Sequence, residues 1–160
     1  HDHCVNIPRV HIATNNNRVN TVKRAVGIPV IANGDVFSGA DAAHILSYTG
    51  ADACMVGRGA FGDPWLFAEI NAVLDGGEAP ERPPLAERMA TALRQVETAA
   101  LEKGERLACI EARARLPWYL KGVPHSAAWK QKLVRISTLD ELRSIASDIT
   151  KGRPPIDIVL

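Results

Sequence analysis

The chain has 160 residues, of which 46% are apolar and 23% are charged, and its formal net charge is +1. This composition is typical of a folded globular protein and argues against wholesale disorder. No apolar run approaches the ~20 residues needed to cross a bilayer, and no signal-peptide pattern opens the sequence. We therefore expect a cytoplasmic protein that has no membrane partner.

The cysteines indicate neither disulfides nor a metal site. Cys4, Cys54 and Cys109 lie far apart without CxxC spacing, so we expect reduced thiols, with Cys54 in the core of a strand and Cys109 on a helix face. The cluster His1-Asp2-His3-Cys4 holds potential metal ligands, but it lies at a chain end, where backbones fray. We expect no bound metal.

The first predicted elements are a strand over 9–13 and a helix over 19–26. A short apolar run at 28–32, bounded by Pro29 and by Asn33-Gly34-Asp35, predicts a strand buried on both faces, as in a parallel sheet. Ser38 and Asp41 then have the spacing of a capping box with Asp in the place of Glu, and Gly50 provides a stop. A helix between these residues follows.

A second strand–helix pair comes next. The predicted strand over 53–56 ends at Gly57-Arg58-Gly59, and Asp63 as N-cap with Pro64 at the first helical position predicts a helix over 65–74. Two strands that alternate with two helices form a βαβα unit, whose parallel crossover is right-handed.

The rest of the chain is predicted to be helical. Residues 78–84 contain three prolines and are typical of a linker, after which apolar residues recur at helical spacing. Ser126 is expected to cap a helix that contains Trp129, and Thr138 with Glu141 forms a capping box for the last helix. We predict an α/β part at 1–77, a linker at 78–84, a helical domain at 85–153 and an extended tail at 154–160.

Two glycine turns follow the two strands, at Asn33-Gly34-Asp35 and at Gly57-Arg58-Gly59. Ligands of parallel sheets bind at the carboxyl ends of strands, where a glycine lets backbone N–H groups approach a phosphate. Arg58 adds a guanidinium that suits phosphate oxygens. The pattern alone fits a phosphate site and fits two tight loops equally well.

These residues resemble the last two barrel strands of bacterial tRNA-dihydrouridine synthases. The resemblance rests on residues 28–36 (IPVIANGDV), Gly50-Ala51-Asp52 and residues 55–67 (MVGRGAFGDPWLF), and most specifically on the continuation from Gly57-Arg58-Gly59 into Pro64-Trp65. Trp118-Tyr119-x-Lys121-Gly122 resembles a second family motif, in the helical RNA-binding domain. Together these motifs cover about residues 19–150.

The resemblance implies a carboxy-terminal fragment of a TIM (β/α)8 barrel followed by an all-α helical-bundle domain. It also implies an enzyme that uses FMN, reduced by NADPH, to convert uridine in tRNA to 5,6-dihydrouridine. The residues that it assigns to the cofactor are Asn33, Gly34, Asp35, Gly57 and Arg58.

A basic block is the expected contact with tRNA. Residues 103–135 hold eight Lys and Arg against two acids, the footprint expected for a polyanionic partner, although a solvated helical face also produces such a block. Trp118 and Tyr119 either stack on an exposed base or, the reading that we favour, pack the helical domain. The residues predicted to bind RNA are Arg113, Arg115, Lys121, Lys130, Lys132 and Arg135.

The sequence departs from the family in several respects, of which two bear on the site residues. The family's catalytic cysteine follows an Asn-x-Gly pattern that none of the three cysteines has, so we expect no catalytic residue in this chain and an inactive fragment. Arg113-Ala114-Arg115 also stands where the family has Arg-Lys-His. Two alternatives stay open: another phosphate- or flavin-binding TIM-barrel enzyme, and a non-catalytic RNA-binding remnant.

Overall fold

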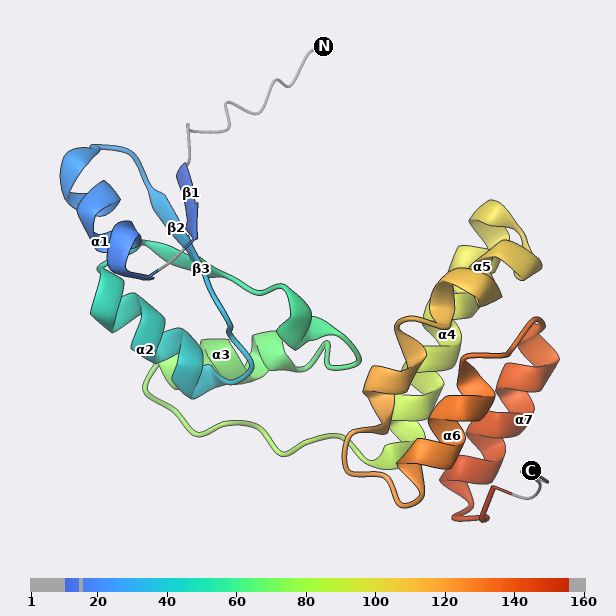
Figure 1. Ribbon diagram of the computed structural model, residues 1–160. Coiled ribbons are helices and arrows are strands. Elements are labelled where there is room, and N and C mark those ends of the chain that lie inside the picture. Colours follow the sequence, from blue (N-terminus) through green and yellow to red (C-terminus); the bar gives the residue numbers. More distant parts are fainter. Residues whose placement is uncertain (1–10, 15, 156–160) are drawn as a thin grey trace, which may run out of the picture. The chain divides into compact units, whose positions relative to one another are not determined.

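The computed structural model describes residues 11–14 and 16–155, with side chains described over 18–155. The described residues form two compact units (Figure 1). Unit 1 runs up to Ala60 and also contains Pro64–Glu81, and unit 2 contains Phe61–Asp63 together with the described residues from Arg82 onwards. Residues 61–63 therefore pack with the helical unit, although they interrupt the α/β part of the sequence.

Unit 1 is built on a parallel sheet of three short strands, β1 (His11–Thr14), β2 (Val30–Asn33) and β3 (Ala53–Met55), in the order β1-β2-β3. Helix α1 (Asn16–Ala25) connects β1 to β2, and α2 (Gly39–Thr49) connects β2 to β3. The predicted alternation of parallel strands and helices is confirmed, with element ends shifted by at most three residues.

The helices cover one face of this sheet. Val30 and Ala32 are fully buried and pack with Val19 of α1 and with Ala42 and Ile45 of α2. The alternate residues of the strands face the other way.

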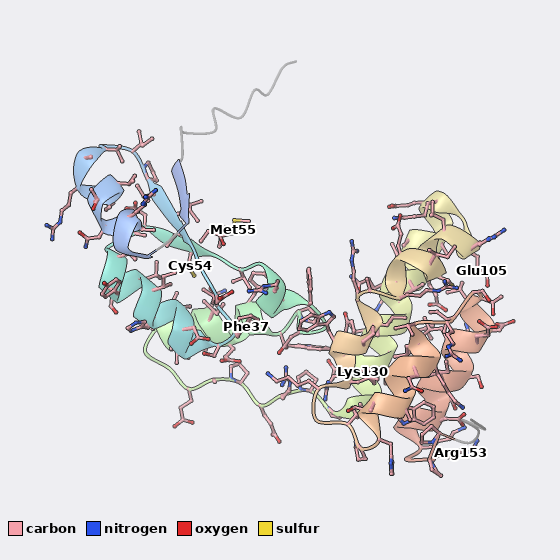
Figure 2. The ribbon with its side chains drawn as sticks, viewed as in Figure 1. Phe37, Cys54, Met55, Glu105, Lys130 and Arg153 are labelled. Atoms are coloured by element: carbon pink, nitrogen blue, oxygen red, sulfur yellow. The ribbon has the colours of Figure 1, made fainter. Side chains whose placement is uncertain are left out.

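That second face is open in the part of the chain that the structure describes. Ile31 is only partly buried, Ala53 is exposed, and Met55 is 42% exposed and points away from α2 and α3 (Figure 2). The prediction of a strand buried on both faces is therefore wrong for β2, because no described element covers its second face.

Helix α2 has the predicted caps in a modified form. The Ser38 hydroxyl accepts a hydrogen bond from the Asp41 amide (3.1 Å), and the Asp41 carboxylate accepts one from the amide of Phe37 (3.0 Å). A capping box with Glu would instead bind the amide of Ser38 itself. At the other end Gly50 adopts a left-handed conformation (φ 68°) and its amide binds the carbonyl of Leu46 (2.9 Å).

Helix α3 (Leu66–Leu74) begins later than predicted. Its N-cap position is Trp65, which makes no capping hydrogen bond with its side chain, so the assignment of Asp63 as N-cap and Pro64 as first helical residue is wrong. The Asp63 carboxylate forms an ion pair with Arg82 inside unit 2 instead. A long-range partner thus replaces the local one.

In its described residues, unit 2 contains helices and no strands. They are α4 (Leu85–Lys103), α5 (Glu105–Ala112), the 3-10 helix η2 (Leu116–Leu120), α6 (Ser126–Leu133) and α7 (Leu139–Thr150). Helix α4 packs against α5 and α7, and α6 packs against η2 and α7. The core residues include Met89, Val96, Cys109, Leu116, Leu120, Trp129, Leu133, Ile136, Leu142 and Ile149.

One of the two predicted helix starts in this unit is confirmed. The Thr138 hydroxyl binds the amide of Glu141 (3.2 Å), and the Glu141 carboxylate binds the amides of Ser137 (2.6 Å) and Thr138 (3.3 Å), which lowers the pKa of Glu141. The other prediction is wrong. Ser126 is the first residue of α6, and the N-cap position is His125, which has φ 54° and no capping hydrogen bond.

Candidate phosphate site and cationic helical surface

The two predicted phosphate loops lie side by side in unit 1. In the register of β2 and β3, Asn33 is opposite Met55, so the turns that follow both strands leave the same edge of the sheet. Arg58 donates to the Asp35 carboxylate across this edge at 2.6 Å, and both side chains remain mostly exposed (65% and 73%). The predicted residues are therefore brought together, around an ion pair that solvent and ligands can reach.

The two glycines of the second turn have different roles. A Cβ atom on Gly59 would lie 2.0 Å from the carbonyl oxygen of Val36, so a side chain there would force the two loops apart. A Cβ on Gly57 would meet no atom within 4 Å. Gly59, within the 3-10 helix η1 (Arg58–Ala60), serves loop packing, whereas Gly57 has open space beside its backbone, as a ligand requires.

The first turn leads into a helix end that is already occupied. The amide of Gly39 donates to the Glu69 carboxylate of α3 (2.7 Å), and the amides of Phe37 and Asp41 are bound as described above. These N–H groups are not available to an anion. A phosphate at this edge would depend mainly on Gly57 and Arg58. Sequence reasoning missed Glu69, because its contact joins residues thirty positions apart.

A second ion pair in unit 1 has a structural role. Lys23 donates to both carboxylate oxygens of Asp52 (2.8 and 2.6 Å), and the amide of Val30 donates to the same carboxylate (2.7 Å). The hydrogen bond from Lys23, followed by that from Val30, lowers the pKa of Asp52. This carboxylate joins α1 to the start of β2 and to the turn before β3.

The six predicted RNA-binding cations of unit 2 lie in three kinds of environment. The Arg113 guanidinium is used internally, since it donates to the carbonyls of Ile136 (2.8 Å) and Arg135 (3.4 Å). The Lys132 ammonium lies 5.5 Å from the ring centre of Trp129. Four others are exposed and form no ion pair with an acid among the described residues: Arg115, Lys121, Lys130 and Arg135.

The two aromatic residues of η2 have opposite environments. Tyr119 is buried, and its hydroxyl donates to Gln95 (3.2 Å); burial raises its pKa. Trp118 is 47% exposed and meets Phe61 edge to face, with ring centres 5.9 Å apart. The prediction of packing is confirmed for Tyr119, whereas the Trp118 ring stays partly open to solvent.

The two thiols that the structure describes are shielded rather than activated. Cys54 on β3 is partly buried and Cys109 on α5 is fully buried, and desolvation raises the pKa of both. Cys4, with the rest of the cluster at residues 1–4, lies outside the described residues. Among the described residues, no group of three or more His, Cys, Asp or Glu side chains has the arrangement of a metal site.

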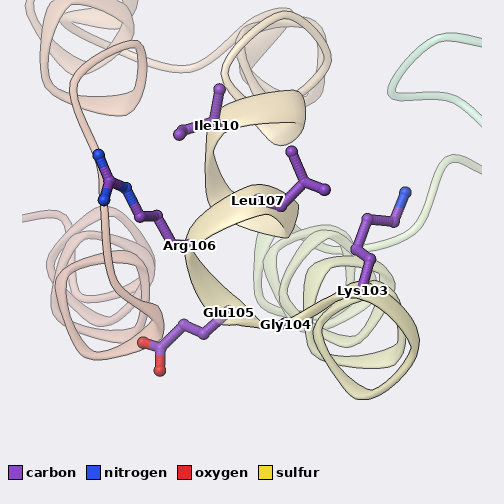
Figure 3. A pocket seen from close by; sticks show the side chains of 6 residues that line it. All are labelled: Lys103, Gly104, Glu105, Arg106, Leu107 and Ile110. Carbon is purple, nitrogen blue, oxygen red and sulfur yellow. The ribbon is translucent and has the colours of Figure 1, made fainter.

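A hollow of about 390 Å³ lies at the turn between α4 and α5 (Figure 3). Six consecutive or nearly consecutive residues line it: Lys103, Gly104, Glu105, Arg106, Leu107 and Ile110. Leu107 and Ile110 are exposed there, and the charged side chains of Lys103, Glu105 and Arg106 point in different directions (Figure 3). Within 11–14 and 16–155, no helix has the length and hydropathy of a membrane span.

Comparison with known proteins identifies the family to which the sequence is similar. The family described as Dihydrouridine synthase (Dus) matches residues 8–152. A probable tRNA-dihydrouridine synthase of Mycobacterium tuberculosis is 39% identical over 115 residues, which cover 72% of this chain and 30% of that protein.

Two Vibrio proteins give the same result. The tRNA-dihydrouridine synthase B of Vibrio cholerae is 40% identical over 123 residues, which cover 77% of this chain and 38% of the relative. That of Vibrio vulnificus is 45% identical over 103 residues, which cover 64% of this chain and 32% of the relative. The chain thus spans between 30% and 38% of the length of these three relatives.

Proposed function

The chain belongs to the dihydrouridine synthase family, and on that premise we propose that it supplies part of an FMN site and a tRNA-binding surface to the reduction of uridine in tRNA. The observation that carries the proposal is the family match over residues 8–152, which spans both the Asp35–Arg58 edge of unit 1 and the basic helices of unit 2. We further propose that the α/β unit is a portion of a TIM barrel, whose remaining strands would cover the open face of the sheet.

The residues of unit 1 fit the phosphate end of FMN. Arg58 presents an exposed guanidinium, Gly57 leaves its backbone accessible, and Asn33, Gly34 and Asp35 lie on the neighbouring turn. When bound, FMN supplies hydride chemistry, with NADPH as its reductant. The protein residues would hold and orient it. No residue of this chain is proposed as the proton donor.

In unit 2 the exposed cations would bind the tRNA backbone. Arg115, Lys121, Lys130 and Arg135 carry their charge at the surface, and such contacts give affinity that falls with salt and does not depend on sequence. A target uridine must leave its stack to reach a flavin, and backbone contacts elsewhere offset the cost of a few kcal/mol. Arg113, which binds internal carbonyls, would hold the connection between α6 and α7 rather than the RNA.

A titration of the chain with FMN, followed by flavin fluorescence, tests the cofactor part. Because unit 1 offers only one edge of a site, we expect weak binding, no uridine reduction by the chain alone, and a further loss with Arg58→Gln. Sub-micromolar binding of FMN by the chain alone would contradict the proposal that the chain supplies only part of the FMN site. Addition of the amino-terminal two thirds of a relative as a separate polypeptide should raise the affinity, and Arg58→Gln should lower the affinity of the combined polypeptides as well.

An RNA-binding function without catalysis is the second candidate, and the uncovered sheet face in unit 1 favours it. The complementation experiment separates the two. If tRNA binds but no partner polypeptide produces dihydrouridine, measured by mass spectrometry of digested tRNA, the binding function alone remains.

A further inference from the structure

The short helix η2 and the two residues that flank it present a ridge of three exposed side chains: Arg115 at the N-cap, Trp118 within the helix and Lys121 at the C-cap. Side chains three residues apart eclipse one another on a 3-10 helix. The amide of Trp118 binds the carbonyl of Arg115 (3.1 Å), which is the hydrogen bond of this geometry. The burial pattern agrees: these three residues are exposed, whereas Leu116, Tyr119 and Leu120 are buried. The solvent-facing side of this segment therefore carries an aromatic ring between two cations.

A buried arginine fixes the inward side of the same segment. Arg88 of α4 is 8% exposed, and its guanidinium donates to the carbonyls of Tyr119 and Lys121, the latter at 2.8 Å. Burial lowers the pKa of Arg88, and its Nε atom has no hydrogen-bond partner among the described residues. These two hydrogen bonds from Arg88 fix the backbone that carries Trp118 and Lys121.

The Trp118 ring is also held by the segment 61–63. Phe61 meets it edge to face, and the backbone of Gly62 lies so close that a Cβ atom would come within 2.4 Å of the Trp118 carbonyl carbon. Two rings that are each almost half exposed, at 44% and 47%, thus form one aromatic surface within unit 2. An edge-to-face partner contacts the ring without covering it and leaves ring surface accessible.

The surrounding charge selects the partner of this surface. From Ala112 to Ser137 the sequence contains six Lys and Arg and no Asp or Glu. An apolar protein segment or a lipid tail would not need two cations spaced around one aromatic ring. An unpaired nucleotide matches this arrangement, because its base stacks on an aromatic face while the phosphates on either side bind cations.

We propose that Arg115, Trp118 and Lys121 form a binding site for an unstacked nucleotide of RNA, in which the Trp118 ring stacks on the base and the two cations bind the flanking phosphates. Phe61 and Arg88 are positioning residues for this site. The proposal deepens the function proposed above and rests on its RNA-binding part.

Binding experiments with the whole chain test it, with an unmodified tRNA transcript, a single-stranded RNA 10-mer and a fully paired RNA duplex as probes. Stacking on one base contributes enough that Trp118→Leu should weaken binding of tRNA and of the 10-mer by roughly 5- to 150-fold. Trp118→Phe, which keeps a ring, should stay within about threefold of the wild type. The duplex offers no unstacked base inside, so its affinity should not change in either variant.

The salt dependence distinguishes stacking from charge. Arg115→Gln and Lys121→Gln should each reduce the slope of log affinity against log salt by about 0.7, the value for one phosphate contact on a single strand. Trp118→Leu should leave the slope unchanged, since it removes no charge. Arg94→Gln, at an exposed position on α4, is the matched control and should leave affinity for the 10-mer unchanged.

The outcomes separate this proposal from the broader one. Wild-type affinity of Trp118→Leu for both tRNA and the 10-mer, in a chain that circular dichroism shows to be folded, would overturn the nucleotide site while tRNA binding stands. Binding of the 10-mer through Trp118 without binding of tRNA would support the nucleotide site and remove the tRNA substrate. Absence of binding to any probe would refute both.

Discussion

Gly62→Ala should destabilise unit 2 by about 2 to 5 kcal/mol. Gly62 has φ +65°, and the left-handed conformation costs an L residue roughly 1 to 2 kcal/mol. In addition the new Cβ would lie 2.4 Å from the Trp118 carbonyl carbon and 2.5 Å from the Tyr119 amide nitrogen, where backbone cannot yield as a side chain can. Overpacking of this kind typically costs about 1 to 3 kcal/mol.

Gly122→Ala is the matched control for the conformational part. Gly122 also has positive φ (+79°), but a Cβ atom there would meet nothing within 4 Å. We therefore expect it to lose only about 1 to 2 kcal/mol. Urea unfolding followed by far-ultraviolet circular dichroism, with hydrogen exchange of the amides in α4 and α7 as a readout confined to unit 2, measures the difference between the two variants.

The comparison between the two glycines decides the argument. Equal losses of stability would show that contact with the η2 backbone contributes nothing and that the segment 61–63 is not docked there. A larger loss in Gly62→Ala, accompanied by faster exchange of the Trp118 and Tyr119 amides, is the expected result. Such a loss would show that residues 61–63 stabilise the helical unit from outside its continuous sequence.

Three further variants or conditions test other parts of the structure. Thr138→Ala removes the capping box of α7 and should cost about 1 kcal/mol in urea unfolding, whereas Thr98→Ala, at an exposed position inside α4, should not destabilise the protein. Cys109 is fully buried and its pKa is raised, so iodoacetamide at pH 8 should modify it only in urea, as peptide mass spectrometry will show, and rapid modification of folded protein would contradict this burial. Lys23 lowers the pKa of Asp52 below its ordinary 3.8, so the stabilisation is complete above that value and is lost as pH falls through the lower, folded pKa. Asp52→Asn should therefore differ from wild type in urea unfolding at pH 7 and approach it at pH 2, and a constant difference would refute the assignment.

The sequence by itself determined the features whose causes lie within a few residues. Gly50 ends α2 because glycine adopts the left-handed backbone conformation without help from distant residues. Thr138 caps α7 because its partner in the capping box, Glu141, lies only three residues away. The apolar run of β2 and the glycine turns after β2 and β3 likewise follow from local pattern. The family motifs depend on the same short stretches, so the family was also recognisable from them.

The tertiary structure decided every feature whose partner lies far along the chain. Asp63 forms an ion pair with Arg82 instead of capping α3. The Glu69 carboxylate accepts a hydrogen bond from the amide of Gly39. The Arg113 guanidinium donates to the carbonyls of Ile136 and Arg135. The ridge of η2 has the same origin, because Arg88 and Gly62 select which side of Trp118-Tyr119 faces solvent. A charged or aromatic residue has many partners of similar local energy, and only packing determines which one lies within reach.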